Sequence, residues 1–516
     1  MGTANKSIEK IVSLENLSVL LEARRKDRRV VLCHGAFDLL HIGHLRHLAA
    51  AAKFGDLLVV TITDDEFINK GPDRPVFNSE LRAEMLAALE LVEYVAIAGH
   101  PSATPVIEVV KPDYYVKGGE YEDAGQDITG KIIGERELVE RLGGQLVFTH
   151  EATHSSTNLL NRHFGMVEES ARAYLVKKQG TQLEDKVAAY FDKISDMKIV
   201  IVGESIIDEY IYVDAMGKAA KENIIATVQR SSEIFAGGAV AAAGHVSALS
   251  KNVELITMVG AADGAENYET LVRESLPDGV DLTFIRRNSG PTVRKTRFVE
   301  PTYIRKLFEV YDMDDTPLDG EPLTNLNAAL AQKCADADLV IVCDFGHGMI
   351  GPETVRLLEE LPVFVAVNTQ SNAGNIGFNL AAKHGGANFL CIDAMEARLV
   401  ARDKHAPVEK ITRHVKDMLS DCPNLIVTSG KRGCFAADKQ DGEITHIPSF
   451  GITAVDTVGA GDAFFVIAAP FLAAGADLET AGIMGNIAGA IKIGIVGHRR
   501  YLEKLEVQRY LISLLK

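Results

Sequence analysis

Short apolar runs alternate with helical segments along nearly the whole chain. Residues 30–33 and 57–62 form two such runs with a helical segment between them, and residues 198–202 begin a second series. A strand that is buried on both faces appears in sequence as a short continuous apolar run, which is typical of parallel sheets. The pattern therefore predicts an α/β fold with helices on both faces of parallel sheets.

The length of the chain, 516 residues, is sufficient for two such units. Residues 165–194 differ from the rest because they are rich in Glu, Lys, Gln and Ala. This composition indicates a solvated helical connector. We therefore expect one domain over residues 1–164, a helical linker over residues 165–195 and a second domain over residues 196–516.

Charge and cysteine content exclude several classes of partner. The net charge of −17 at pH 7 opposes binding to nucleic acid and to anionic membranes, so we expect neither. The six cysteines form no CxxC pair, and no apolar run has the length of a membrane span. These features predict a cytoplasmic protein with reduced cysteines.

The first functional motif is GAFDLLHIGH at residues 35–44, between a predicted strand and a predicted helix. The start of a helix offers free N–H groups and a partial positive charge, which suit a triphosphate. Gly43 lets the backbone approach phosphate, and His41 and His44 lie on one face of a helical turn. Two imidazoles there can stabilise charge on the α-phosphate and on departing pyrophosphate. Asp38 is expected to orient the turn. The alternative, a pair of capping or core histidines, explains less of the motif.

The second functional motif is DTVGAGDAF at residues 456–464. Gly459, Ala460 and Gly461 would present successive N–H groups at a helix start, which forms a cradle for a migrating phosphoryl group. Asp462 lies at the same helix start, where its carboxylate could accept the proton of an attacking sugar hydroxyl. The motif therefore predicts phosphoryl transfer to a hydroxyl.

The N-terminal motif resembles the HxGH signature of the cytidylyltransferase-like nucleotidylyltransferases, and residues 8–164 resemble the nucleotidyltransferase domain of bifunctional ADP-heptose synthases. The likeness includes the segments around residues 53–56, 74–82, 111–121 and 154–162. It implies in-line attack of a sugar 1-phosphate on the α-phosphorus of ATP, or of CTP, with Mg²⁺ present. The resemblance adds Lys53 to the catalytic histidines. It implies phosphate binding by Gly35, Ala36, Phe37, Gly43, Lys117, Ser155, Ser156 and Thr157.

The C-terminal motif looks like the DTxGAGD signature of the ribokinase (PfkB) family, and the likeness extends over residues 196–516. It implies an ATP-dependent sugar kinase with a small β lid at residues 209–235. Sugar binding is implied for Asp208, Gly237 and Gly238, and an indirect Mg²⁺ role for Glu396. Nucleotide or phosphate binding is implied for Thr428, Gly430, Gly433, Thr457, Gly459, Ala460, Gly461 and Asn486. Relatives often dimerise through such a lid, so we expect a homodimer.

Three departures from the family pattern bear on the substrate. Residues 240–242 are Val-Ala-Ala where the heptose kinases have an Asn, Asp393 replaces the Asn of the NxxE motif, and His347 stands where Lys is common. The order of the domains is also the reverse of that in ADP-heptose synthases, which begin with the kinase.

The sequence as a whole predicts a Rossmann-like nucleotidylyltransferase followed by a ribokinase-like kinase, with sugar phosphates and nucleotides as substrates. The expected activities are D-glycero-D-manno-heptose 7-phosphate kinase and heptose 1-phosphate adenylyltransferase. One alternative keeps both chemistries on another sugar with CTP as donor. Another is a non-catalytic nucleotide- or sugar-sensing scaffold, which the complete Asp462 and histidine motifs disfavour.

Overall fold

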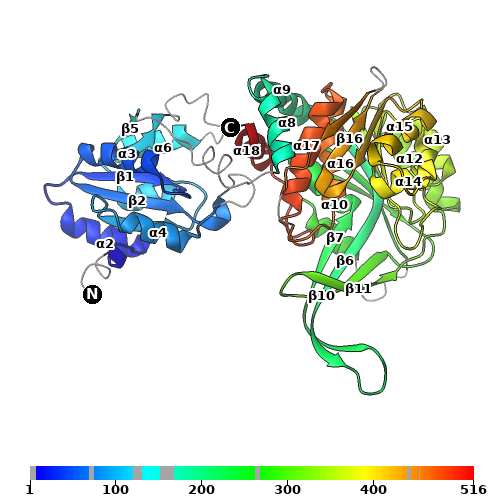
Figure 1. The fold of residues 1–516 in the computed structure, drawn as a ribbon, viewed down its shortest axis with the longest axis horizontal. Coiled ribbons are helices and arrows are strands. Elements are labelled where there is room, and N and C mark those ends of the chain that lie inside the picture. The colour runs from blue at the N-terminus through cyan, green and yellow to red at the C-terminus, as the bar shows by residue number, and fades with distance from the viewer. Residues whose placement is uncertain are drawn as a thin grey trace. The chain divides into compact units, whose positions relative to one another are not determined.

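A computed structural model describes residues 7–68, 75–119, 131–150, 168–261, 268–438, 443–451 and 454–515. The chain forms two compact units, which comprise residues 1–166 and residues 167–511 (Figure 1). No helix in these described ranges is both long enough and apolar enough to cross a membrane.

The first unit contains a five-stranded parallel sheet in the order β3-β2-β1-β4-β5. Its strands are β1 (Val30–Gly35), β2 (Leu57–Thr63), β3 (Tyr94–Ala98), β4 (Tyr114–Gly118) and β5 (Gln145–Thr149). The order reverses between β1 and β4. In sheets of this kind, ligands bind outside the carboxyl ends of the strands at such a reversal.

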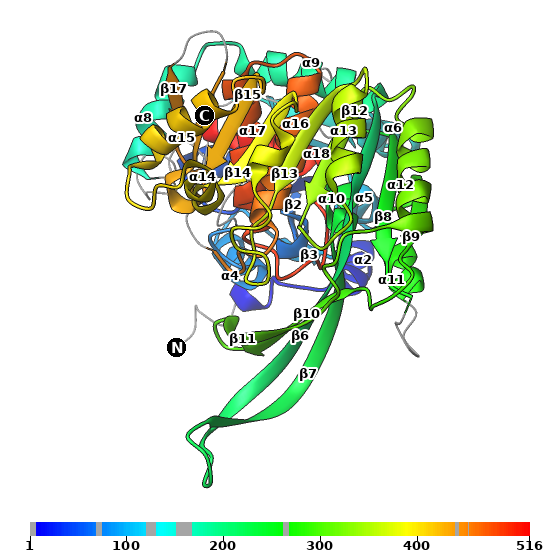
Figure 2. The same ribbon diagram turned by 90° about the vertical axis from the view of Figure 1, so that its right-hand side faces the viewer.

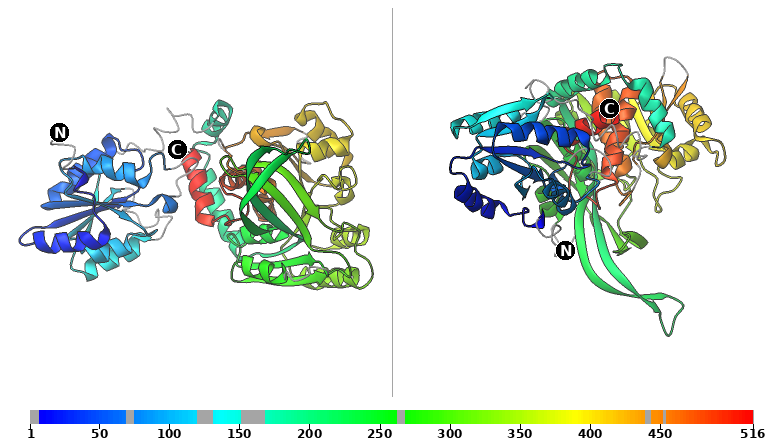
Figure 3. Two further views of the ribbon diagram at one scale, coloured as in Figure 1. Left: turned by 90° about the horizontal axis from the view of Figure 1, so that it is seen from below. Right: turned by 60° about the vertical axis from the view of Figure 1, so that its left-hand side comes forward.

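Helices cover both faces of this sheet (Figure 3). One apolar core joins the sheet to α2 (Leu14–Arg24), α5 (Thr104–Val110) and α6 (Lys131–Arg141). The core on the other face joins it to α3 (Ile42–Ala51) and α4 (Ser79–Ala87). Val31 and Val60 face the second core, whereas Leu32 and Val59 face the first, as the alternation of side chains along a strand requires. The predicted Rossmann-like fold of this unit is confirmed.

The second unit is built on a larger sheet whose body has the order β9-β8-β6-β12-β13-β14-β15-β16-β17. The pairs are parallel as far as β15, and the last two strands are antiparallel. Its strands are β6 (Lys198–Lys218), β8 (Asn252–Val259), β9 (Val280–Arg286), β12 (Leu339–Asp344), β13 (Phe364–Thr369), β14 (Phe389–Asp393), β15 (Asn424–Thr428), β16 (Cys434–Ala437) and β17 (Ile444–Ile447). The order reverses beside β6, so the carboxyl ends near β6 and β12 are the expected ligand site.

Helices pack on this sheet to give the predicted ribokinase-like α/β unit. They are α10 (Ala239–Val246), α11 (Tyr268–Ser275), α12 (Gly320–Lys333), α13 (Pro352–Glu360), α14 (Ala394–Ala401), α15 (Val408–Met418), α16 (Ala460–Ala473), α17 (Leu478–Lys492) and α18 (Lys504–Leu515). Helices α12 to α15 share one apolar core with the strands. Helix α16 is buried along residues 463–472, because its sequence is apolar on all sides.

The second half of β6 leaves the body and forms a β lid with three other strands (Figure 2). These strands are β7 (Ile225–Gly238), β10 (Val293–Glu300) and β11 (Arg305–Asp312). The lid predicted over residues 209–235 is therefore present, and it is larger than predicted because β10 and β11 extend it.

The segment predicted as a solvated helical connector forms α8 (Glu169–Lys178) and α9 (Leu183–Asp196), and most of its residues are exposed apart from one set of buried apolar side chains. Phe191 is fully buried, and its ring packs edge-on against that of Phe471 at 5.0 Å. The Tyr174 hydroxyl donates to Glu479 at 2.6 Å. Apolar residues at helical spacing, placed among the many charges of this segment, thus pack one side of the two helices against the rest of the second unit while the charged side remains exposed.

Candidate functional sites

The turn between β1 and α3 brings the two motif histidines together. His41 is the N-cap of α3, and its Nδ1 accepts the N–H of Gly43 at 2.9 Å. The rings of His41 and His44 are stacked with their centroids 4.1 Å apart. Because Nδ1 of His41 is an acceptor, the neutral ring carries its proton on Nε2. This atom can donate to an anionic oxygen at the helix start.

Two buried side chains fix the shape of this turn. The Asp38 carboxylate accepts the N–H of Val76 at 2.6 Å and also that of Phe77. The guanidinium of Arg82 donates to the carbonyl oxygens of Thr63 and Phe77, both at 2.9 Å, and to Ala36 O and Asp65. Asp38 thus orients the turn through the backbone, and Arg82 joins it to the ends of β2 and α4.

Arg82→Ala should lower the free energy of unfolding of the first unit by about 3 kcal/mol, because it leaves one buried and two partly buried carbonyl groups without their donor. Denaturant titration monitored by nucleotidyl transfer would measure this loss. Arg24→Ala is the matched control, because Arg24 is about half exposed in its ion pair with Glu93 and should contribute at most about 1 kcal/mol. Equal losses for the two variants would contradict the structural role of Arg82.

Lys117 lies at the carboxyl end of β4, on the same sheet edge as His41. Its ammonium forms an ion pair with Glu135 at 3.6 Å, and the side chain is largely buried. Tyr115 donates to the same carboxylate at 3.0 Å. A phosphate that binds Lys117 would therefore compete with Glu135.

Lys53 does not join this group. It is exposed in η1 (Ala52–Phe54), which follows α3 and precedes the amino end of β2. Helix α3 rises about 15 Å over its length, so Lys53 lies at the opposite edge of the sheet from His41. We therefore exclude Lys53 from the catalytic group. Ser155, Ser156 and Thr157, also predicted to bind phosphate, lie outside the described residues, as does Arg74.

Further polar side chains at the carboxyl edge were missed by the sequence analysis. His34 Nδ1 is 3.0 Å from Thr61 Oγ1, and His47 Nδ1 is 2.7 Å from Thr149 Oγ1. His34 directly precedes the Gly35 motif, and a polar residue at the end of a buried strand was the available signal.

In the second unit, α16 begins as the glycine motif predicted. Gly459 is the N-cap, with a φ of +74°. A Cβ on this residue would lie 2.9 Å from the His498 ring, so both backbone shape and space require glycine. The amides of Gly461 and Asp462 lie in the first turn, where no helical carbonyl can reach them. The N–H of Ala460 donates to the carbonyl oxygen of Thr457 at 3.3 Å, and Thr457 itself is exposed.

The carboxylate of Asp462 is half-buried and accepts a hydrogen bond from Gln370 at 2.5 Å. Burial raises the pKa of Asp462, and the positive charges of His498 and Lys295 oppose this rise. Gln370 follows the carboxyl end of β13. Asp462 is therefore a carboxylate of increased basicity at the sheet edge where phosphoryl transfer is expected.

Asp208 lies opposite on the lid side of the site. It is buried, forms an ion pair with Arg297, and lies 3.4 Å from His498 Nε2. Burial raises its pKa, but the hydrogen bond from His498 and the charge of Arg297 lower it well below the usual range. Gly237 passes so close that a Cβ would lie 2.2 Å from Asp208 Oδ2. Gly238 follows as the N-cap of α10.

The residues DFGHG begin at the last residue of β12 and continue into a loop that is held by Glu204. The buried Glu204 carboxylate accepts the N–H groups of Phe345 at 3.1 Å, His347 at 3.0 Å and Met349 at 3.3 Å. Burial raises the pKa of Glu204. Burial also lowers the pKa of His347 to about 3, and the charge of Lys295 adds to this effect. His347 is thus a neutral side chain at a position where the family pattern commonly has a lysine.

Glu396 is buried at the start of α14. One carboxylate oxygen accepts the N–H of Ser371 at 2.9 Å and the other that of Asp393 at 2.7 Å, and Asp393 completes a capping box. Burial and the nearby Asp393 charge raise the pKa of Glu396 to about 8. Carboxylate oxygens suit Mg²⁺, but those of Glu396 already accept amides, so a role through metal-bound water fits this residue best.

The predicted nucleotide-binding residues lie around β15, β16 and α17. Thr428 ends β15, and Gly430 and Gly433 bound the turn that follows. Asn486 is buried and donates to the carbonyl oxygens of Ile447 at 3.3 Å and Pro448 at 3.2 Å. Asn486 therefore holds the segment after β17 in place by its side chain.

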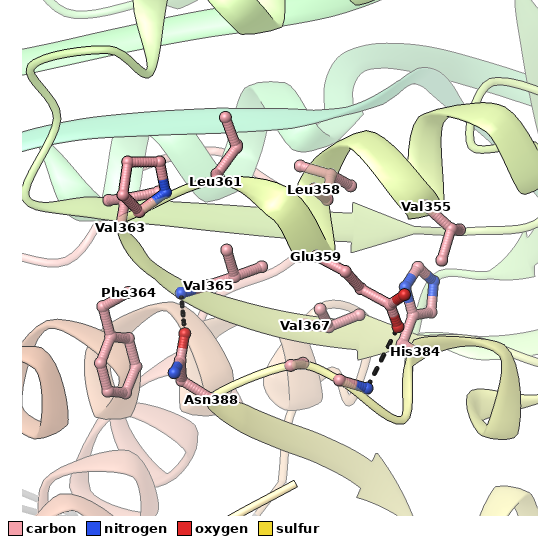
Figure 4. Close-up of a pocket in the computed structure, with 13 residues that line it drawn as sticks. Val355, Leu358, Glu359, Leu361, Val363, Phe364, Val365, Val367, His384 and Asn388 are labelled. Atoms are coloured by element: carbon pink, nitrogen blue, oxygen red, sulfur yellow. Dashed lines mark hydrogen bonds between the residues drawn. The ribbon is translucent and has the colours of Figure 1, made fainter. Parts of the chain in front are cut away.

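A cavity of about 420 Å³ lies away from these residues (Figure 4). It is lined by α13, the amino-terminal part of β13 and the segment around His384, and Glu359 accepts the N–H of Gly386 at 3.2 Å. Because Gln370 and Asp462 meet beyond the other end of β13, this cavity is separate from the candidate kinase site.

The second unit thus has the form of an α/β kinase with a carboxylate at the start of a glycine-capped helix. Residues 196–504 match the model of the pfkB family carbohydrate kinases, which is more than half of the chain. The chain belongs to this family. Residues 32–162 match the cytidylyltransferase-like model.

The curated relatives match a smaller part of this chain than the family model of the kinases does. The bifunctional protein HldE of Syntrophotalea carbinolica is 36% identical over 166 residues, which are 31% of this chain and 32% of the relative. HldE of Geobacter metallireducens is 35% identical over 157 residues, 30% of this chain and 31% of the relative. The chain thus covers about a third of the length of these relatives.

Solved structures resemble the second unit. Phosphofructokinase-2 from Escherichia coli in complex with substrates and products has a TM-score of 0.50 and 15% identity, over 62% of this chain and 100% of that one. Ribokinase from Thermotoga maritima has a TM-score of 0.48 and 24% identity, over 61% of this chain and 99% of that one.

Proposed function

We propose that the protein is a bifunctional sugar kinase and sugar-1-phosphate nucleotidylyltransferase, with the second activity in residues 1–164 and the first in residues 196–516. The observation that carries the proposal is the position of Asp462 at the start of α16, with Asp208 across the same site. The paired histidines at the start of α3 supply the equivalent argument for the first unit.

In the kinase reaction, Asp208 accepts hydrogen bonds from sugar hydroxyl groups and Asp462 accepts the proton of the attacking hydroxyl. The amides at the start of α16 bind the transferred phosphoryl group as its charge develops. Thr428, Gly430, Gly433 and the segment held by Asn486 border the nucleotide. Mg²⁺ bound with ATP would neutralise phosphate charge, with Glu396 acting through bound water.

In the nucleotidyl transfer reaction, His41 and His44 donate to phosphate oxygens, and Gly35, Ala36, Phe37 and Gly43 form the turn around them. Attack of a sugar 1-phosphate oxygen on the α-phosphorus breaks the bond to pyrophosphate. Lys117 would bind a phosphate of either substrate. No covalent enzyme intermediate is required.

We propose D-glycero-D-manno-heptose 7-phosphate as the kinase substrate and heptose 1-phosphate, with ATP, as the substrates of transfer. The support is the identity of about 36% to proteins named HldE, which concerns the N-terminal part of the chain. The second candidate retains both chemistries with another sugar and CTP. It is favoured by the kinase departures, above all the neutral His347 and the absence of an Asn at residues 240–242.

Phosphorus NMR with Mg²⁺, ATP or CTP and a panel of sugar phosphates tests both candidates. ADP and a new anomeric phosphate from heptose 7-phosphate, together with pyrophosphate from heptose 1-phosphate and ATP, would support the heptose proposal. Turnover of another sugar, or transfer only with CTP, would support the second candidate. Nucleotide binding without any turnover would instead support a sensing scaffold.

The pH dependence of the kinase should report the environment of Asp462. The base acts when ionised, so turnover should be lost as the pH falls through its pKa, which burial raises above 3.8. Lys295→Met removes a positive charge that lowers this pKa. The acid limb of the pH profile of kcat should therefore move to higher pH. A limb that stays in place or moves to lower pH would contradict the assignment of Asp462 as the base.

We also propose that the protein forms a homodimer through its β lid. The short, charged strand β11 exposes Leu307, Phe308 and Val310, and the last two lie on the same face of the strand. Light scattering should give twice the chain mass, and Phe308→Glu should return the mass of one chain. A monomeric wild-type protein would contradict the proposal.

A further inference from the structure

Lys492, the last residue of α17, is fully buried, which is rare for a lysine. Its ammonium donates to the carbonyl oxygens of Val458 at 2.8 Å and Gly497 at 2.7 Å. Removing an ammonium from water costs several kcal/mol unless charge and hydrogen bonds compensate. The mechanism proposed above does not use this charge, so its burial requires another explanation.

Asp456 binds the backbone N–H groups of Val458 and Gly497, the two residues whose carbonyl oxygens bind Lys492. Its carboxylate accepts the N–H of Val458 at 3.1 Å and the N–H of Gly497 at 2.9 Å. Val458 and Gly497 therefore each have their N–H bound to Asp456 and their carbonyl bound to Lys492. We call this arrangement of Asp456, Lys492 and the two backbone units the ionic clamp. It joins the loop before α16 to the loop after α17.

The surroundings of the ammonium favour a cation. Burial lowers the pKa of Lys492, and the carboxylates of Asp456, Asp462 and Asp208 oppose this effect. The Lys306 ammonium, from the lid, is the facing positive charge, and it pairs with Asp456. Three carboxylates and two carbonyl oxygens thus surround one fixed positive charge and one from the lid.

Each of the two backbone units in the ionic clamp directly precedes a residue of the candidate site. Val458 precedes Gly459, the N-cap at which the phosphoryl cradle begins, and Gly497 precedes His498, which interacts with Asp208. A displacement of either carbonyl would therefore move the cradle or His498 directly. A shift of about 1 Å in such groups can reduce turnover about 10²-fold.

We infer that the Lys492 ammonium is a built-in monovalent cation that positions the phosphoryl cradle and His498, so that the kinase needs no monovalent cation from solution. Lys492 is a positioning residue because it acts through Val458 and Gly497. Carbonyl and carboxylate oxygens are also the ligands that K⁺ accepts. Truncation of the side chain to alanine should leave a site for K⁺ or NH₄⁺, whereas methionine fills the same space without a charge.

The first experiment uses the wild-type protein and rests on its proposed kinase activity. Turnover with the sugar substrate should be equal, within about twofold, in buffers whose only added monovalent cation is tetramethylammonium, K⁺ or NH₄⁺. Activation by K⁺ of more than about tenfold would overturn the inference while leaving the kinase function intact. Absence of turnover in every buffer would instead count against the proposed function.

The variants provide the second experiment. Lys492→Ala should lose about 10²-fold in kcat, with a smaller change in the KM for ATP, and should recover at least about tenfold in K⁺ or NH₄⁺. Lys492→Met should lose as much and should not recover. A methionine variant with wild-type kcat, or a folded alanine variant that neither ion rescues, would overturn the inference.

Thermal unfolding gives a readout that needs no substrate. The unfolding midpoint of Lys492→Ala should rise by about 2–4 °C when K⁺ or NH₄⁺ replaces tetramethylammonium, because the ions bind only the folded protein. Lys416→Ala is the matched control, since the Lys416 ammonium donates to the carbonyl of Cys422 at 2.6 Å, outside the kinase site. Equal shifts in the two variants would show a general salt effect and would contradict a specific cation site.

Discussion

Asp462→Asn should reduce the turnover of sugar phosphorylation by about 10³-fold or more, because it removes the base that accepts the hydroxyl proton. The substitution is nearly isosteric, and an asparagine Oδ1 can still accept the hydrogen bond from Gln370, which is 2.5 Å long in the native site. The loss should therefore appear in kcat, with the KM for ATP changed by about twofold at most. Coupled measurement of ADP release would give both constants.

Nucleotidyl transfer is the internal control for this variant. The histidines and Asp462 belong to separate compact units, so transfer by Asp462→Asn should remain close to wild type. Loss of both activities in a folded variant would contradict independent active sites. If Asp462→Asn retained phosphorylation, a group other than Asp462 would have to be the base.

The motifs that could be predicted are those that depend on local geometry. A strand, a glycine turn and a helix start are encoded within about ten residues, so the positions of His41, His44 and Gly459 followed from the sequence. The same holds for both parallel sheets, whose strands are short apolar runs. Asp208 and Gly237 were identified through a family resemblance, and their close approach is a result of strand pairing that the sequence does not specify.

The parts that could not be predicted depend on contacts between distant residues. Lys53 was assigned to the catalytic group through a family resemblance, but a helix of ten residues places it at the other edge of the sheet. Tyr210 donates to Asp456, which is 246 residues further along the chain, at 2.8 Å. The buried charges of Lys492 and Glu204 likewise bind backbone groups that no local pattern indicates.

His41→Ala should reduce nucleotidyl transfer by about 10²–10³-fold, since it removes a donor aimed at charge that develops on the phosphates. Alanine also removes the helix cap that His41 provides to Gly43 N–H at 2.9 Å, which by itself contributes about 1 kcal/mol to helix stability. The measured quantity is pyrophosphate release at saturating sugar 1-phosphate, with phosphorylation by the second unit as the reference activity.

His41→Asn separates these two effects. An asparagine side chain can cap α3 as the imidazole does, but it has no group at the position of Nε2. If the imidazole acts on the phosphates, His41→Asn should be stable to heat and almost as inactive as His41→Ala. The exposed His100 provides the matched control, and His100→Ala should retain full transfer. Recovery of transfer by asparagine would mean that His41 serves the reaction through the helix cap alone, because the cap is the one function that the two side chains share.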